Sequence, residues 1–145
     1  MILLDTNVIS ELMRPVIAPA VAAYLQAQDP DTIFTASLCA AEIRYGIARL
    51  PLGRRREGLA AAFRTFLAEG FAGRVIVFDS ACAEGYASIR VRREAAGLRI
   101  SIPDAMIAGT ALAHGATVVT RNARDFSDCG IEVVDPWETT SAGPA

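Results

Sequence analysis

Short apolar runs alternate along the chain with longer stretches in which apolar residues recur every three or four positions. The short runs are typical of buried strands, and the longer periodicity is typical of amphipathic helices. Strands are predicted over residues 2–4, 33–35, 75–78, 117–120 and 131–134, and helices over residues 6–13, 20–28, 37–50, 55–69, 80–96 and 101–114. Because strands and helices alternate, we predict an α/β fold, a three-layer αβα sandwich around a mainly parallel sheet of about five strands.

The strand runs are apolar throughout, without the alternation of a sheet that faces water on one side. Helices should therefore cover both faces of the sheet. Polar residues are suited to begin several helices: Asp5 or Thr6, Ser37, and Asp79 or Ser80. We find no internal repeat and no linker, and predict one domain over residues 1–138 followed by a flexible tail at 139–145.

The composition is that of a globular chain. Of its 145 residues, 52% are hydrophobic and 21% are charged, so it differs from disordered sequences. No apolar run approaches the ~18–20 residues that cross a bilayer, and the N-terminus has no basic segment before Asp5. We therefore expect a cytoplasmic protein without a membrane partner.

Cysteine and histidine chemistry is poorly supported. Cys39, Cys82 and Cys129 are widely spaced and odd in number, and no Cys/His cluster accompanies them. Neither a disulfide framework nor a zinc site is expected. The single histidine, His114, lies at the end of a predicted helix before Gly115, so we do not expect it to be a catalytic base.

All 14 basic residues are arginines, and the formal net charge is −2. Overall charge does not identify a nucleic-acid-binding protein, so any such binding must come from local clusters. Two clusters exist, at 54–56 and around 90–99; from them we select Arg54, Arg55, Arg92 and Arg93 as possible RNA contacts. Arginine binds phosphate well, but a solvated helix face explains these clusters equally well.

Acidic residues occur where predicted strands end. Asp5 directly follows the first strand, Asp125 follows the fourth, and Asp104 begins the helix after Ile102 and Pro103. In parallel α/β sheets the working site lies beyond the carboxyl ends of the strands. Each acid also has a simpler explanation, since Asp5 can cap a helix, Asp104 can belong to a capping box and Asp125 can begin a turn.

Glu42 is harder to explain as a structural residue. Leu38 and Tyr45 lie one helical turn away on either side, which places a carboxylate on a largely apolar stripe. Its desolvation is costly without a partner. Several carboxylates in one cleft without Lys or His would repel one another unless a divalent cation neutralised them. Ligation by oxygen alone indicates Mg²⁺, with Mn²⁺ as a substitute, and such ions suit phosphodiester hydrolysis.

Four segments resemble, in order, motifs of PIN-domain proteins, in particular the VapC and FitB toxins. They are ILLDTNVISE at 2–11, AAEIRYG at 40–46, IPDAMIA at 102–108 and TRNARDF at 120–126; VDPW at 134–137 also resembles the end of FitB-like members. Any one motif is weak, but four in order at compatible spacing are specific, and they span nearly the whole of residues 1–138. The resemblance implies a PIN-like fold and a magnesium-dependent ribonuclease.

The resemblance also implies roles for individual residues. Asp5 and Asp104 would hold the metal most directly, and Glu42 would complete the metal site and help to position the attacking water. Some relatives carry Asp where this chain has Asn122, so the fourth acid is open between two positions; we select Asp125. The residues implied to be accessory to these acids are Thr6, Asn7, Thr120 and Asn122.

Partners follow from the same resemblance. It implies the toxin of a type II toxin–antitoxin system that acts on RNA, forms a homodimer and is silenced by a small VapB- or FitA-like antitoxin. Operator DNA would be bound only through the antitoxin. The RNA target stays open.

Three other functions share part of this sequence pattern. A haloacid dehalogenase-type phosphatase needs a second Asp where this chain has Asn7, and a lysine, which the chain lacks. A catalytically degenerate PIN module that acts by protein or RNA binding would be free to lose its acids, yet Asp5, Glu42 and Asp104 are all present. A nuclease that cleaves DNA would use the same acids, and only the likeness to small toxins favours RNA.

Overall fold

The computed structural model describes residues 1–138, so the tail predicted at 139–145 lies outside the described residues. Five parallel strands form one sheet in the order β3-β2-β1-β4-β5. Their bounds are β1 Ile2–Leu4, β2 Ile33–Ala36, β3 Val75–Ile76, β4 Thr117–Val119 and β5 Val133–Val134. The central strand β1 pairs with a neighbour on each side, and its three residues are buried.

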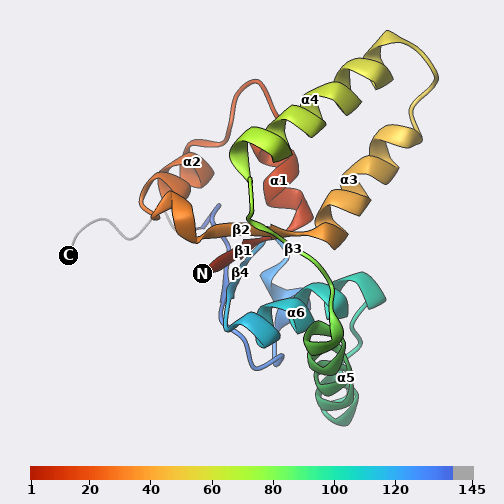
Figure 1. Cartoon of the computed structure of the whole chain (residues 1–145). Coiled ribbons are helices and arrows are strands. Elements are labelled where there is room, and N and C mark those ends of the chain that lie inside the picture. Colours follow the sequence, from red (N-terminus) through yellow and green to blue (C-terminus); the bar gives the residue numbers. More distant parts are fainter. Residues whose placement is uncertain (139–145) are drawn as a thin grey trace.

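Six α-helices cover the sheet in two layers. They are α1 Thr6–Leu12, α2 Pro19–Gln26, α3 Ser37–Ala48, α4 Arg54–Gly70, α5 Ser80–Ala95 and α6 Ile102–His114. Figure 1 shows α1 to α4 on one side of the sheet and α5 and α6 on the other. Two short 3₁₀ helices, Pro30–Thr32 and Ala123–Phe126, complete the described elements.

Alternate residues of the strands divide the core between the two layers. Leu3 and Val118 pack with Ile107 of α6, whereas Leu4 and Val119 pack on the other face with the helices that contain Val8 and Phe63. Both faces of the strands are therefore dry, which explains their continuous apolar sequence. The predicted three-layer αβα sandwich with a parallel five-stranded sheet is confirmed.

Both edge strands are shorter than predicted. The strand predicted over 75–78 ends at Ile76, since only Val75 and Ile76 pair with β2, and Val77 beyond them is 65% exposed. The strand predicted over 131–134 begins at Val133, because pairing with β4 starts there. An apolar run in the sequence indicates that the segment is buried. A β-strand also requires hydrogen bonds to a neighbouring strand, which the run does not predict.

The predicted helix starts are mostly correct. Asp5, Asp79 and Ser101 each accept a backbone N–H of the helix that follows. Ser37 was wrong as a capping residue, because it is the first helical residue and Ala36 precedes it without a side-chain hydrogen bond. His114 is the last residue of α6, and Gly115 ends the helix with left-handed backbone, at a φ of 61°.

The two helices below the sheet cross at a pair of glycines. A Cβ on Gly85 would lie 2.5 Å from the Gly109 carbonyl oxygen, and one on Gly109 would lie 2.5 Å from the Tyr86 nitrogen. The backbones of α5 and α6 therefore meet directly, which fixes the position of α6 and of the residues in its first turn. No described helix, within residues 1–138, is long and apolar enough to cross a membrane.

Candidate metal and nuclease site

Asp5 lies at the carboxyl end of β1, at the centre of the sheet, and caps α1. One carboxylate oxygen accepts the Thr6 backbone N–H at 2.8 Å. The other accepts the Thr120 hydroxyl at 2.7 Å and is 3.5 Å from Asn7 Nδ2. The carboxylate is 5% exposed and held by neutral donors on both oxygens, so its orientation is fixed without loss of its negative charge.

Thr120 connects two segments that are more than a hundred residues apart in sequence. Besides donating to Asp5, its hydroxyl accepts Asn7 Nδ2 at 3.2 Å and the Asn122 backbone N–H at 3.1 Å. A hydroxyl has one donor and two acceptor positions, so all three are used. Asn7 Oδ1 also accepts the Arg121 backbone N–H at 3.1 Å. The loop after β4 is thereby joined to the start of α1.

Glu42 reaches the same region from α3. Its Oε2 accepts the Thr6 hydroxyl at 2.7 Å, and the side chain is half-buried. Thr6 therefore contacts both acids: its backbone nitrogen donates to Asp5 and its hydroxyl to Glu42. This neutral partner explains how the chain tolerates a carboxylate on an apolar helix face, and the sequence did not predict it.

Asp104 stands in the first turn of α6. Ser101 caps that helix and accepts the Asp104 backbone N–H at 3.2 Å, with Pro103 in the first turn. The Asp104 residue is half-buried. The capping interpretation is therefore correct for the Asp104 backbone, and Ser101 also forms a hydrogen bond that lowers the pKa of the Asp104 carboxyl against the effect of burial.

Asp125 and Asn122 belong to the loop after β4. Asp125 lies in the 3₁₀ helix whose last residue, Phe126, is buried in the core, and its backbone N–H donates to the Asn122 carbonyl at 2.9 Å. Both side chains are exposed. The negative charge of Asp125 raises the pKa of Asp104.

Electrostatics join these acids into one group. Burial is the main cause that raises the pKa of Asp5, and the charges of Asp104 and Glu42 raise it further, against the hydrogen bonds from Thr120 and Thr6. Burial also raises the pKa of Asp104, and the charges of Asp125 and Glu42 add to the effect. Like charges that oppose one another's ionisation are the pattern expected of a cation site.

The donor set fits a hard divalent cation. Carboxylate oxygens, with no histidine or cysteine among them, are ligands that Mg²⁺ and Mn²⁺ prefer. Within residues 1–138, no three acidic, cysteine or histidine side chains are already gathered as a complete metal site. Mg²⁺ keeps several of its waters and is usually bound through one or two carboxylates, so it does not require three gathered side chains.

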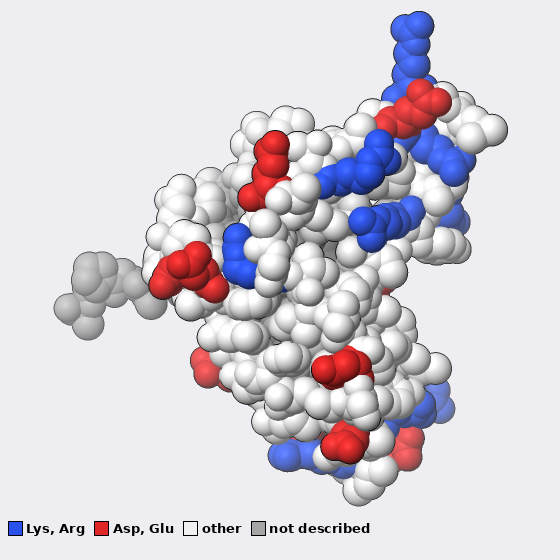
Figure 2. Space-filling model, viewed as in Figure 1, with Lys and Arg blue, Asp and Glu red and all other residues white. Residues whose placement is uncertain are grey.

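The arginines selected as RNA contacts differ in their surroundings. Arg54 and Arg55 are exposed in the first turn of α4, and Figure 2 shows basic side chains gathered over this end of the molecule. Arg92 is exposed and paired with Asp128 at 3.1 Å. Arg93 was wrong as an RNA contact, because it is 4% exposed and its guanidinium donates inward to main-chain oxygens.

Comparisons with known proteins identify the family of the chain. The PIN-domain model matches residues 2–131. The chain is 42% identical to the plasmid stability protein StbB of Pseudomonas syringae pv. tomato and 38% identical to the VapC ribonuclease Y4jK of Sinorhizobium fredii, each over 95% of this chain and 99% of that protein. It is 37% identical to the toxin FitB of Neisseria gonorrhoeae, over 94% of this chain and 99% of that protein.

A solved structure of FitAB bound to an IR36 DNA fragment contains a chain with the same fold. It superposes with a TM-score of 0.87 at 37% identity, over 94% of this chain and 96% of that one. The matched region includes Asp5, Glu42, Asp104 and Asp125. With a family model over most of its length and relatives well above 30% identity, the chain belongs to the PIN-domain family.

Proposed function

We propose that this protein is the toxin of a type II toxin–antitoxin system and acts as a metal-dependent ribonuclease. One observation carries the proposal: Thr6 donates to both Asp5 and Glu42, and the charges of Asp5, Glu42 and Asp104, which come from β1–α1, α3 and α6, oppose one another's ionisation. The relatives named as a VapC ribonuclease and a FitB toxin support the reaction and the biological class. We assign the nuclease domain to residues 1–138.

The four acidic residues would have different roles in the reaction. Asp5 and Asp104 would hold the cation, which we propose is Mg²⁺ with Mn²⁺ as a substitute. When bound, such an ion supplies positive charge against the phosphodiester and lowers the pKa of water. Glu42, oriented by the Thr6 hydroxyl, would accept a proton from the attacking water. Asp125 would complete the acidic group on the side of Asp104.

Neutral residues hold these acids in place. Thr120, Asn7 and the Thr6 backbone fix the carboxylate of Asp5, while Asn122 contributes its backbone N–H to Thr120. Outer hydrogen bonds of this kind orient metal ligands and are often as necessary as the ligands themselves. We assign Thr6, Asn7, Thr120 and Asn122 this supporting role.

RNA would approach with its backbone toward exposed arginines. Arg54, Arg55 and Arg92 are accessible, so we propose them as phosphate contacts. Raising the salt concentration should then weaken RNA binding.

The proposed partners come from the relatives. The FitAB structure contains DNA, and a VapBC2 structure from Rickettsia felis, 27% identical with a TM-score of 0.73, is bound to a promoter fragment. We propose that this chain forms a homodimer, binds a small VapB- or FitA-like antitoxin and meets operator DNA only through it.

The test is RNA cleavage by the purified chain. A structured RNA mixture is incubated with Mg²⁺, with Mn²⁺ or with chelator, after any co-purified antitoxin has been removed by unfolding and refolding. Asp104→Asn is purified in parallel, and Glu84→Gln, an exposed acid on α5, is the matched control for loss of one negative charge. We expect metal-dependent cleavage by the unmodified chain and by Glu84→Gln only. Cleavage by Asp104→Asn at the original rate would contradict the proposal.

A further inference from the structure

Arg93 has a buried, positively charged side chain that forms no ion pair among the described residues. It lies in the last turn of α5, is 4% exposed and makes no ion pair with any acid in residues 1–138. Its Nε has no hydrogen-bond partner among those residues. Buried charges are costly unless they are paired and hydrogen-bonded, so the position of this guanidinium calls for a reason beyond packing.

The guanidinium bonds two segments, each next to an acid of the site. One nitrogen, Nη1, donates to the Ser127 carbonyl at 2.5 Å and to the Ser127 hydroxyl at 3.2 Å, two residues after Asp125. The other, Nη2, donates to the Arg99 carbonyl, two residues before the Ser101 cap of the helix that carries Asp104. One planar group therefore links the two loops that present Asp104 and Asp125.

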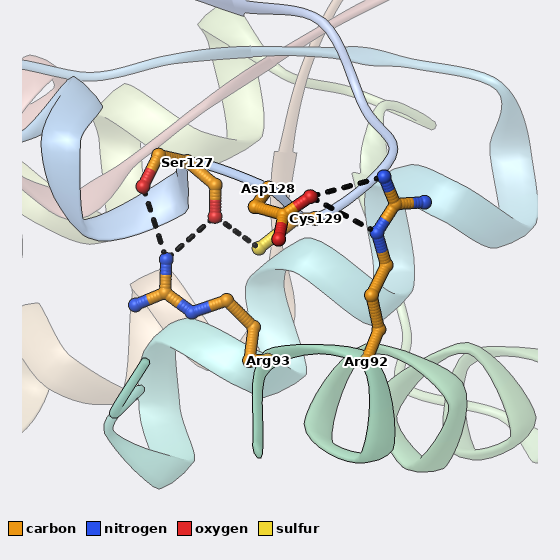
Figure 3. A network of polar contacts seen from close by, with 5 residues as sticks. All are labelled: Arg92, Arg93, Ser127, Asp128 and Cys129. Atoms are coloured by element: carbon orange, nitrogen blue, oxygen red, sulfur yellow. Dashed lines mark hydrogen bonds and ion pairs between the residues drawn. The ribbon is translucent and has the colours of Figure 1, made fainter. Parts of the chain in front are cut away.

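The neighbouring arginine is a natural comparison. Figure 3 shows Arg92 and Arg93 leaving the same end of α5 and reaching the same loop, Arg93 toward Ser127 and Arg92 toward Asp128. The Arg92 pair is exposed on the surface. Surface ion pairs contribute little, whereas the Arg93 side chain is buried.

We propose that Arg93 is a positioning residue of the acidic site, which sets the separation of Asp104 and Asp125 by bonding both loops and thereby sets the affinity for the divalent cation. This inference rests on the proposed metal dependence. Its positive charge also acts on Asp104, where it opposes the rise in pKa that burial causes. The charge repels an incoming cation, whereas the bonds favour its binding, so the two effects have opposite signs.

The opposite signs make a direct test possible. We would titrate the refolded chain, free of RNA and antitoxin, with Mn²⁺ alone, following free Mn²⁺ by electron paramagnetic resonance at constant pH. Arg93→Gln removes the charge and most of the bonds, Arg93→Lys keeps the charge but not the planar fork, and Arg90→Gln, which removes a charge paired only within α5, is the matched control. Circular dichroism melting of each variant measures the stability separately.

We expect both Arg93 variants to bind Mn²⁺ about tenfold more weakly or worse, as is typical for loss of a group behind a metal ligand, and Arg90→Gln to be unchanged. Unchanged or tighter Mn²⁺ binding by folded Arg93→Gln would overturn the inference. It would show that Arg93 affects the site only through its positive charge, or only the stability of the fold, and not through its hydrogen bonds. If that variant does not fold, Arg93→Lys decides in the same way; if neither folds, Ser127→Ala, which removes one exposed hydroxyl, must weaken binding or the inference fails. Absence of Mn²⁺ binding by the unmodified chain would overturn the proposed metal dependence as well.

Discussion

The crossing of α5 and α6 allows a quantitative prediction for Gly109→Ala. The new methyl would lie 2.5 Å from the Tyr86 nitrogen and 2.8 Å from the Cys82 oxygen, about 0.9 Å inside the 3.4 Å at which ordinary contact begins. Both atoms are main chain, so no side chain can rotate away and the helices must separate. Overpacking of this kind costs about 3 kcal/mol at the upper end of its range, and alanine returns about 1 kcal/mol of helix propensity.

We therefore expect Gly109→Ala to lower the free energy of unfolding by about 2 kcal/mol, and Tm by about 4–8 °C. Gly58→Ala on α4 is the control, because its methyl meets nothing within 4 Å and should stabilise by about 0.5–1 kcal/mol. The assay is thermal and urea unfolding followed by circular dichroism. If Gly109→Ala were as stable as Gly58→Ala, the direct backbone contact between the helices would be refuted.

Two further predictions concern the acidic site. In chelator, burial raises the pKa of Asp5 and of Asp104 above its ordinary value, so the stability that these protonated acids contribute is present below about pH 3.8 and is lost as pH rises through the raised pKa. Asp104→Asn cannot ionise, so its free energy of unfolding should exceed that of the unmodified chain by an amount that grows from pH 4 to pH 7. A difference that stays constant with pH would contradict the raised pKa of Asp104. Thr120→Val should weaken Mn²⁺ binding by about ten- to a hundredfold, because it removes the hydroxyl that donates to Asp5. Thr117→Val, at the start of the strand that precedes Thr120, is the matched control, and equal binding by both variants would count against the role of Thr120.

The fold was predictable because burial leaves a clear pattern in this sequence. The strand at 2–4 and the start of the helix after Asp5 were correct to the residue. Edge strands were overestimated at 77–78 and 131–132, which lie outside the paired residues of β3 and β5. Pairing depends on a neighbour that is distant in sequence, and no local pattern records it.

The candidate site was predictable in its acids and less so in their supports. Carboxylates at strand ends can be read from the sequence, since the topology of a parallel sheet brings those ends together. The hydrogen bond from Thr6 to Glu42 joins residues 36 positions apart, and the bonds from Arg93 to Ser127 join residues 34 positions apart. A cluster of arginines on a helix gives no sign of which member faces the core, and for this reason Arg93 was misassigned.

The choice of partners for the acids is itself an argument for a cation. Within residues 1–138, the hydrogen bonds to the Asp5 and Glu42 carboxylates come from hydroxyl, amide and main-chain donors, and none comes from an arginine. Neutral donors orient a carboxylate but leave its charge in place, so the cost of burial and mutual repulsion persists in the folded chain. A purely structural acid would be stabilised more by a direct arginine partner, and 14 arginines are available. An acidic group that is held rigidly but left unneutralised is therefore best explained as a site that a divalent cation completes.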